Sequence, residues 1–296
     1  MADEPIQRRC GTHDPGTGDR GRMAAIEANF LAQSGIAEAL LSVTIEVAFV
    51  HVINGSAGKV TAAQRQQQIQ LLNEAYSSSN ISFKYDEASV VEVDNADFFK
   101  MGHKSLRERQ CKTQHRAIDP TRGLNFYTAE PGGGLLGWAT FPFEMEGDPV
   151  MDGVVILHSA LPGGSSAPYN LGATAVHEVG HWLGLYHTFQ DSCSGIGDDV
   201  ADTPSHAGPN FGKPADSGQP WNLCPSEPSG ALCPIHNYMN YVDDDSMWEF
   251  TTGQISRVWA QIGMFRNGLL AAPAGFAAES PETGALESVF SSQVVW

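Results

Sequence analysis

The sequence lacks any run of about 18 or more apolar residues, so it predicts no membrane-spanning helix. Basic residues are also scarce: 17 lysines and arginines stand against 34 acidic residues, which gives a net charge of −17. Such a chain repels polyanions. Neither nucleic acid nor an anionic membrane surface is therefore expected as a partner. No internal repeat is apparent. The 296 residues, 42% of them hydrophobic, are sufficient for the core of one compact unit.

The first residues, MADEPIQRRCGT, contain no apolar h-region, so no signal peptide is visible in the sequence. Cysteine is sparse, with five residues, and this odd number cannot be paired completely within the chain. Spacing alone does not determine which of these cysteines pair.

The most informative segment is HEVGHWLGLYH, residues 177–187. Two histidines four apart on a helix differ by about 40° in direction and lie roughly 6 Å apart on one face. His177 and His181 can therefore bind one metal ion. His187 would be rotated by about 240° if the helix continued, so it can join them only if the chain breaks first. Gly184 is suited to the left-handed conformation that ends a helix at that point.

This set of side chains predicts a catalytic zinc site. Three imidazoles leave the fourth position of Zn²⁺ open for water, and Glu178 can act as general base toward that zinc-bound water without binding the metal. A buried helix with core histidines is the alternative for two histidines alone. The glutamate, the glycine and the third histidine at the required offsets argue against it.

The pattern H-E-x-x-H-x-x-G-x-x-H resembles that of the metzincin metalloproteases, and NYMNY (237–241) resembles their methionine-containing turn. The flanking segments GDDVADTP (197–204), PIHNYMNY (234–241), LGWATFP (136–142) and VTIEVAFVHVI (43–53) are similar to the pappalysin family. Within it, the similarity is to enzymes of the ulilysin and fungal extracellular metalloprotease type. Together these segments cover roughly residues 40–266.

The expected fold class is α/β (α+β). Apolar patterning predicts strands at 42–53, 124–128, 136–143 and 154–158, a strand pair or extended strand at 81–85 and 90–93, and helices at 61–79, 103–115, 171–183 and 251–266. The resemblance implies a metzincin catalytic domain with a mixed twisted sheet and the active-site helix in an upper subdomain, above a loop-rich lower subdomain. We expect a pro-segment-like region at 1–38, the catalytic domain at 39–268 and a low-complexity tail at 269–296.

The resemblance also implies roles for residues after the zinc motif. Met239 is expected beneath the metal as an apolar support, and Tyr241 either donates a hydrogen bond to the oxyanion or packs in the core. A disulfide Cys193–Cys224 is the first pairing expected, with Cys233 as the competing partner.

The same resemblance implies separate roles for two acidic segments. Asp198 and Thr203, with the Val200 carbonyl, are expected to bind Ca²⁺, and a solvated acidic loop is the alternative. Asp243, Asp244 and Asp245 follow the methionine turn, where an acid would favour Arg or Lys after the scissile bond. The cluster has one residue more than the usual spacing, so the particular aspartate stays open.

Cys10, in RRCGT, is a possible fourth zinc ligand. A thiolate bound to zinc displaces the catalytic water, and the resemblance implies a latent form that is released by cleavage after the stretch containing Arg20 and Arg22. A disulfide from Cys10 to Cys111 or Cys233 is the alternative.

The predicted function is that of a zinc-dependent endopeptidase acting on polypeptides. The resemblance implies that the enzyme is secreted. A zinc amidase on a non-protein substrate and a catalytically silent binding module with this fold are the alternatives. The sequence carries no indication of oligomeric state.

Overall fold

The computed structural model describes residues 8–13, 15–34, 42–195, 197–214 and 222–270. Its centre is a twisted sheet with strand order β2-β1-β4-β6-β5, and β3 pairs with the far end of β1. The strands are β1 (Val43–Ile53), β2 (Ile81–Lys84), β3 (Val91–Asp94), β4 (Gly123–Ala129), β5 (Gly137–Ala139) and β6 (Val154–Leu157). Only β5 is antiparallel to its neighbour among these strands, and it forms an edge of the sheet.

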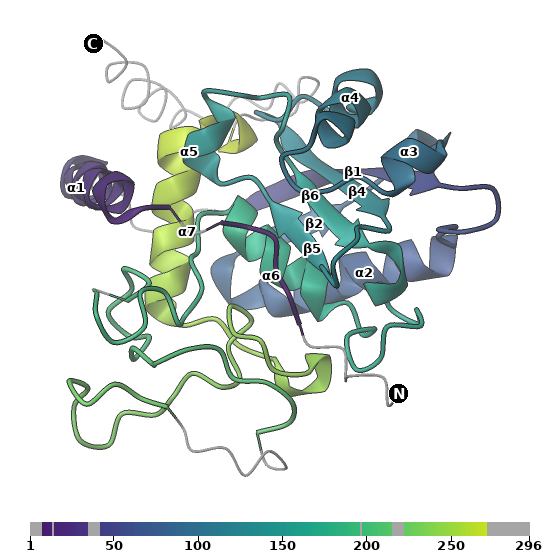
Figure 1. Cartoon of the computed structure of the whole chain (residues 1–296). Helices are drawn as coiled ribbons and strands as arrows, with labels where there is room; N and C mark the ends of the chain where they lie inside the picture. Colours follow the sequence, from purple (N-terminus) through teal and green to yellow (C-terminus); the bar gives the residue numbers. More distant parts are fainter. Residues whose placement is uncertain (1–7, 14, 35–41, 196, 215–221, 271–296) are drawn as a thin grey trace.

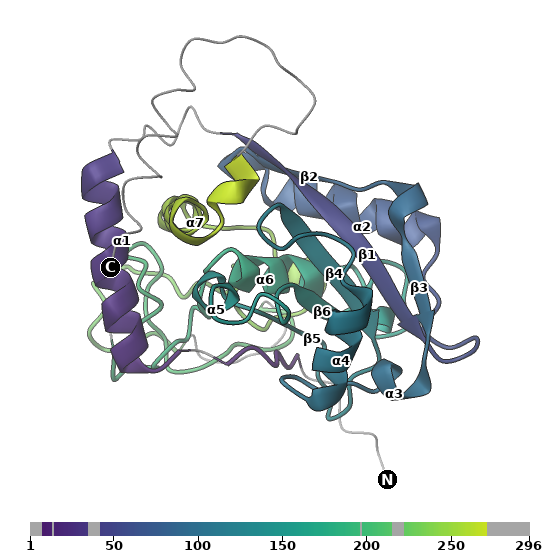
Figure 2. The same ribbon diagram turned by 90° about the horizontal axis from the view of Figure 1, so that it is seen from above.

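Helices lie on both faces of the sheet (Figures 1 and 2). They are α1 (Thr17–Ser34), α2 (Ala62–Ala75), α3 (Ala96–Phe99), α4 (Leu106–His115), α5 (Pro142–Met145), α6 (Ala173–Trp182) and α7 (Thr252–Phe265). The main core joins α2, α6 and α7 to one face, while a smaller core joins α3 and α4 to the other. The structure therefore has the predicted fold class, a mixed sheet with helices, and α6 is wholly buried.

Local capping rules explain where several helices begin. Thr61 accepts a hydrogen bond from the Gln64 amide, and the Gln64 side chain accepts one from the Thr61 amide, so the predicted start of α2 is confirmed. Thr251 and Gln254 form the same reciprocal pair at α7. Each pair satisfies two amides that would otherwise lack partners.

Two predicted strand assignments were wrong. Residues 81–85 and 90–93 do not pair with each other, because β2 lies parallel to the first part of β1 and β3 to its last part. The strand expected at 136–143 ends at Ala139, because Pro142 starts the short helix α5. Helix α4 begins at Leu106, where Ser105 caps it, and not at His103.

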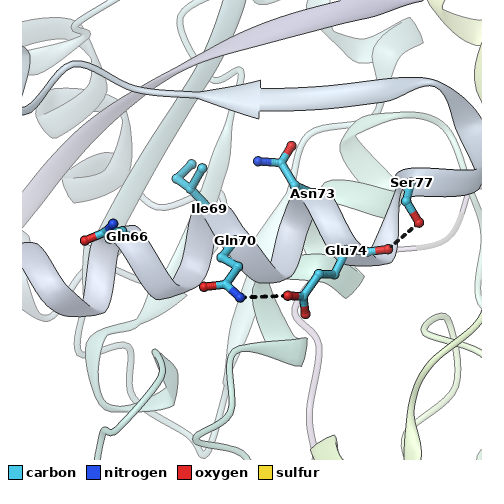
Figure 3. Close-up of a pocket in the computed structure, with 6 residues that line it drawn as sticks. All are labelled: Gln66, Ile69, Gln70, Asn73, Glu74 and Ser77. Atoms are coloured by element: carbon cyan, nitrogen blue, oxygen red, sulfur yellow. Dashed lines mark hydrogen bonds between the residues drawn. The ribbon is translucent and has the colours of Figure 1, made fainter.

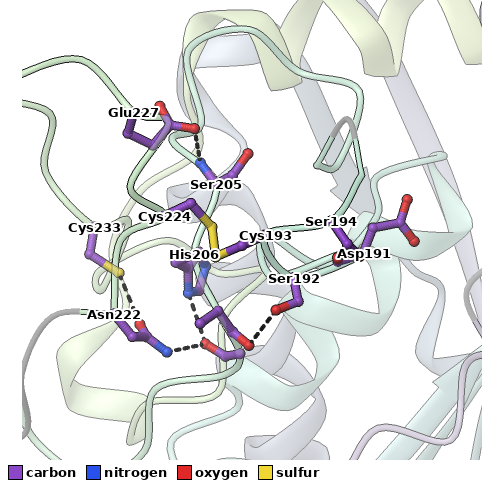
Figure 4. Close-up of a disulfide and its surroundings, with 12 residues drawn as sticks. Asp191, Ser192, Cys193, Ser194, Ser205, His206, Asn222, Cys224, Glu227 and Cys233 are labelled. Atoms are coloured by element: carbon purple, nitrogen blue, oxygen red, sulfur yellow. Dashed lines mark hydrogen bonds between the residues drawn. A yellow bond between two sulfur atoms is a disulfide. The ribbon is translucent and has the colours of Figure 1, made fainter.

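After α6 the chain forms loops below the sheet (Figure 1). The predicted disulfide Cys193–Cys224 is confirmed and cross-links this region (Figure 4). Cys233 is a buried free thiol within reach of Asn210 and Asn222, so the competing pairing is wrong. Cys111 is free and buried, and Cys10 is free as well, so the disulfide proposed for Cys10 is not formed.

The N-terminal segment crosses the molecule before it reaches β1. In Figure 1 it runs past β5 and α6 and continues into α1, which packs beside α7. The tail expected at 269–296 falls mostly outside the described residues. Among the helices that the structure describes, none is both long and apolar enough to cross a membrane.

Candidate metal centre and active site

The three histidines of the motif meet at one point. The Nε2 atoms of His177 and His181 are 3.1 Å apart, those of His181 and His187 also 3.1 Å, and those of His177 and His187 3.3 Å. Nitrogens bound tetrahedrally to zinc at about 2.0–2.1 Å lie roughly 3.3 Å apart. The spacing of the histidines therefore fits a single zinc ion.

Hydrogen bonds on the other ring nitrogens orient two of these ligands. His177 Nδ1 donates to the Tyr238 carbonyl and His181 Nδ1 to the Leu185 carbonyl, each at 2.7 Å. These bonds fix the tautomer with the lone pair on Nε2, which is the form that binds a metal. Burial lowers the pKa of His177 well below its usual value, so the imidazole is neutral.

Gly184 brings the third ligand to the site. Its φ of 99° is left-handed, its amide donates to the His181 carbonyl, and the Leu185 amide donates to the Gly180 carbonyl, both at 2.9 Å. This pair of bonds is a Schellman ending of the helix. The chain therefore turns back at the point where the sequence predicted a break, and His187 reaches the other two histidines.

Cys10 closes the fourth side of the cluster. Its Sγ and the imidazole nitrogens of the three histidines all lie within 4.8 Å of one another. The neighbouring residues hold it there as an added strand on the edge of the sheet: the Gly11 amide donates to the Gly137 carbonyl at 2.8 Å, and the Leu136 amide donates to the Arg9 carbonyl at 2.9 Å. An extended peptide on an exposed sheet edge is a common mode of peptide binding.

Glu178 lies beside the metal cluster without joining it. Its Oε2 accepts from Thr12 Oγ1 at 3.0 Å and from Cys10 Sγ at 3.3 Å. Burial raises the pKa of Glu178 to about 8 in the metal-free chain. A carboxyl next to the open metal position and away from bulk water can accept a proton from a nucleophile.

Met239 and Tyr241 complete the surroundings of the histidines. A Cβ placed on Gly180 would lie only 2.4 Å from Met239 Sδ, so the methionine packs directly against the zinc helix. The hydroxyl of Tyr241 lies 3.2 Å from His187 Nε2 and accepts from the Cys10 amide at 3.3 Å. Tyr241 therefore faces the cluster and not the core.

Residues 118–263 match the model of the peptidase M43 family, described as pregnancy-associated plasma protein-A. The chain is 38% identical to an extracellular metalloprotease of Pyricularia oryzae, over 88% of this chain and 90% of that protein. It is 36% identical to extracellular metalloprotease 1 of Coccidioides posadasii, over 88% and 91%. The chain belongs to the pappalysin family of metzincin metallopeptidases.

Solved structures agree with this assignment. This pappalysin superposes on a promirolysin mutant of Tannerella forsythia with a TM-score of 0.72 and 27% identity, covering 88% of this chain and 97% of that one. Mature mirolysin with a cleaved peptide gives a TM-score of 0.62 and 29% identity, covering 78% and 99%. The chain is thus a metalloendopeptidase with a catalytic metal, and its substrates are polypeptides.

In the loop expected to bind calcium, the oxygens of the three predicted ligands lie close together. Thr203 Oγ1 donates to Asp198 Oδ1 at 2.6 Å and lies 2.8 Å from the Val200 carbonyl. Asp198 Oδ2 is buried and has no hydrogen-bond partner among the described residues, and burial raises the pKa of Asp198 to about 7. Asp202 lies elsewhere: it accepts from Thr251 and Gly253 at the start of α7.

Of the three aspartates after the methionine turn, Asp244 faces the active site. Its Oδ2 accepts from the Leu171 amide at 2.8 Å and the Ala173 amide at 3.3 Å, at the start of α6. Its other oxygen pairs with Arg8, which is also buried. Asp245 instead pairs with Lys213 at the surface, and Asp243 is bound through its backbone to Gly212.

The sequence interpretation missed three residues of the N-terminal segment that contact the catalytic body. Arg8 pairs with Asp244, Thr12 bonds Glu178, and the guanidinium of Arg20 contacts Asp191, Asp199 and the Gly197 carbonyl. The positions of Arg8 and Thr12, each two residues from Cys10, could have indicated such a role. Nothing near Arg20 in the sequence links it to a loop 171–179 residues away.

A hollow of about 600 Å³ lies away from this centre, along α2 (Figure 3). Its lining is Gln66, Ile69, Gln70, Asn73, Glu74 and Ser77. Gln70 Nε2 donates to Glu74 Oε1, one turn further along the same helix, at 2.8 Å. It contains no histidine or cysteine, so it offers no comparable metal chemistry.

Proposed function

We propose that this pappalysin is a secreted zinc endopeptidase that is held latent by its own N-terminal segment. The observation that carries the proposal is the cluster of Cys10 Sγ and three imidazole nitrogens, with Glu178 beside it. Two of the histidines are oriented through their second nitrogen, as metal ligands usually are. The relatives named as extracellular metalloproteases support secretion.

The chain's residues have distinct tasks in peptide hydrolysis. When bound, zinc supplies Lewis acidity toward the peptide carbonyl and lowers the pKa of water toward about 7. Glu178 takes the proton of the attacking water and returns it to the leaving amine. Tyr241, whose hydroxyl faces the histidine cluster, donates a hydrogen bond to the developing oxyanion.

The function is tested with zinc-loaded wild-type chain and Glu178→Ala, both freed of residues 1–35, on casein and on Arg-containing peptides. The wild type should cleave internal peptide bonds, and the variant should be slower by roughly 10²–10⁴-fold, the usual contribution of a general base. Hydrolysis of non-peptide amides with no peptide cleavage would favour the amidase. An inert wild type would favour the silent binding module.

Latency is supported by the way the N-terminal segment lies in the site. It occupies the edge of β5, where an extended substrate could add as a strand, and it carries Cys10 to the metal position. Cys10 and Gly137 form a parallel bridge, so this segment runs along β5 in the same direction as the strand. The promirolysin comparison covers 88% of this chain and the mature mirolysin comparison 78%, in keeping with a pro-segment near residues 1–38.

The preference for Arg or Lys after the scissile bond is supported by Arg8. Its guanidinium is buried against Asp244, 5.0 Å from the Tyr169 ring, and donates to the Val242 carbonyl and Thr174 Oγ1. A buried carboxylate that pairs with one arginine of the chain itself can pair with an arginine of a substrate. Among the aspartates 243–245, we therefore assign the specificity to Asp244.

A structural Ca²⁺ at Asp198, Val200 and Thr203 is supported by the buried, unpartnered Oδ2 of Asp198. A carboxylate oxygen in that position is costly unless a cation binds it. Added Ca²⁺ should raise the melting temperature of the wild type and leave that of Asp198→Asn unchanged. A wild-type chain that gains no thermal stability from Ca²⁺ would contradict the site.

A further inference from the structure

Arg257 of α7 lies under the turn that carries the third histidine of the metal centre. Its Nε donates to the Gly184 carbonyl at 2.9 Å, and its guanidinium lies 4.3 Å from the centre of the Tyr186 ring. The side chain is 3% exposed. One guanidinium therefore contacts both the residue where the zinc helix ends and the residue directly before His187.

The Gly184 carbonyl needs such a partner. Carbonyls at the end of a helix receive no hydrogen bond from an amide of that helix. A buried carbonyl without a donor costs free energy. Gly184 can adopt many backbone conformations because it lacks a side chain, so its own stereochemistry does not hold the turn in one state. Two side chains of α7 restrict the backbone of Gly184 instead. Arg257 donates to its carbonyl, and Gln261 packs so closely that its Cγ would lie 2.4 Å from a Cβ on Gly184.

We propose that Arg257 is a positioning residue for the metal centre, which holds the Gly184–Tyr186 turn so that His187 meets His177 and His181. This inference rests on the proposed zinc site and adds a residue 70 positions after His187 to it. His187 follows this turn, whereas His177 and His181 are both carried by the helix itself, and the Leu185 carbonyl that His181 Nδ1 bonds is also part of the turn.

The same guanidinium also contacts the N-terminal helix. Its Nη1 lies 3.1 Å from Glu27 Oε2, and Gln261 Nε2 donates to the same carboxylate at 3.3 Å. Glu27 thus binds the two α7 side chains that restrict Gly184. The bond from Arg257 Nε to the Gly184 carbonyl does not involve Glu27, so the positioning role should persist after α1 is removed.

The test measures metal binding by the full-length apo chain. Co²⁺ binding is monitored by absorption, and Zn²⁺ binding by competition with a chromophoric chelator. Arg257→Met should weaken both metals by about 10–100-fold, the usual loss when a residue that orients ligands is removed. It should also alter the Co²⁺ d–d bands. Arg257→Lys keeps the charge but cannot reproduce the planar fork, so it should give a smaller loss in the same direction.

Arg65→Met is the matched control. Arg65 is also a buried arginine that donates to a carbonyl, that of Val60, at 2.8 Å and pairs with a carboxylate, that of Glu87, but it lies on α2 away from the turn. Both substitutions should lower the melting temperature, and Arg65→Met should leave metal affinity within about two-fold of wild type because Arg65 contacts Val60 and Glu87 and not the Gly184–Tyr186 turn.

Equal metal affinity and equal Co²⁺ spectra in the Arg257 and Arg65 variants would overturn the inference. If Arg257→Met does not fold, Arg257→Lys decides by the same comparison. A wild-type chain that binds zinc tightly but cleaves no peptide would contradict the proposed function and leave the positioning role intact.

Discussion

Asp244 links two parts of the active site through one carboxylate. One oxygen accepts from the amides at the start of the zinc helix, and the other pairs with Arg8. A carboxylate is favourable at a helix N-terminus because the backbone amides there lack partners. The carboxylate to which we assign the proposed specificity is thus held in place by the helix that carries His177 and His181.

In the enzyme freed of its N-terminal segment, Asp244→Asn should lower kcat/KM by about 10–100-fold for peptides with Arg after the scissile bond, since a buried charge-assisted pair is lost. Asn keeps an oxygen for the Leu171 and Ala173 amides, so peptides with Leu at that position should change little. Asp245→Asn is the control, because Asp245 pairs with Lys213 at the surface. Identical peptide profiles in both variants would refute the assignment to Asp244.

His51 of β1 gives the chain a pH-dependent stability that is separate from catalysis. It is 2% exposed, its Nδ1 lies 2.8 Å from Thr128 Oγ1, and burial, with Arg65 nearby, lowers its pKa to about 3. Above about pH 6.5 it is neutral in both the folded and the unfolded chain. Between about pH 6.5 and 3 only the unfolded chain binds the proton, so stability falls as the pH falls.

Urea unfolding of the full-length chain across this pH range should show that dependence. The contribution of one histidine cannot exceed about 1.4 kcal/mol per pH unit. His51→Gln should remove that contribution and flatten the pH dependence. An unchanged slope in the variant would show that other groups are responsible.

At the scale of elements, a buried ion pair joins the ends of α6 and α7. Arg266 pairs with Asp152 at 2.7 Å, donates to the Trp182 carbonyl at 3.0 Å and lies over the Trp182 ring, while the Trp182 indole donates to Asp152. All of these side chains are fully buried. Removing one partner leaves the other charged and without compensation.

Asp152→Ala should therefore lower the free energy of unfolding by about 3–5 kcal/mol, as measured by denaturant titration. Asp148→Ala is the matched control, because Asp148 pairs with Arg109 at the surface and solvent screens that pair. Similar midpoints for the two variants would show that the buried pair contributes no more than a surface one.

Elements governed by local rules could be predicted from the sequence. The zinc helix, its break at Gly184 and the start of α2 at Thr61 depend on neighbouring residues, and the structure has all three. The pairing of β2 and β3 depends on which part of β1 each strand meets, so it could not be derived from their apolar patterns. The disulfide Cys193–Cys224 was expected only through family resemblance, because spacing leaves several pairings open.

The residues of the candidate site also fall into a group that local sequence predicts and a group that it does not. His177, Glu178, His181 and His187 lie within eleven residues, so helical geometry was enough to group them. The arginines that surround the site come from distant parts of the chain. Arg8 and Arg257 reach it through tertiary packing, and Arg20 pairs with Asp191 and Asp199 in the loop after the zinc motif. No local pattern around Arg20 or Arg257 indicates a partner.

At the scale of the whole molecule, the N-terminal segment touches both halves of the catalytic body. Arg8 and Cys10 lie in the active site, Arg20 lies against the loop of Asp199, and Glu27 contacts α7. The side chain of Arg20 is 1% exposed, so its ion pairs with Asp191 and Asp199 are shielded from solvent on the arginine side. The N-terminal segment is therefore anchored at several points and not by Cys10 alone.

Arg20→Ala should shorten the lag before autoactivation of the zinc-loaded full-length chain, because it removes the ion pairs with Asp191 and Asp199. Arg22→Ala serves as the control, since Arg22 is exposed and pairs only with Asp19 of its own helix among the described contacts. The time course of casein cleavage measures both. Equal lags would mean that α1 does not contribute to latency.

In the proposed latent enzyme, the thiolate of Cys10 is the fourth ligand of a zinc ion that three histidines bind. Zinc K-edge X-ray absorption on the zinc-loaded full-length chain measures these ligands. We predict three nitrogen ligands at about 2.0–2.1 Å and one sulfur at about 2.3 Å, with the sulfur replaced by a nitrogen or oxygen scatterer in Cys10→Ser. A spectrum of the wild-type chain without a sulfur ligand would contradict this account.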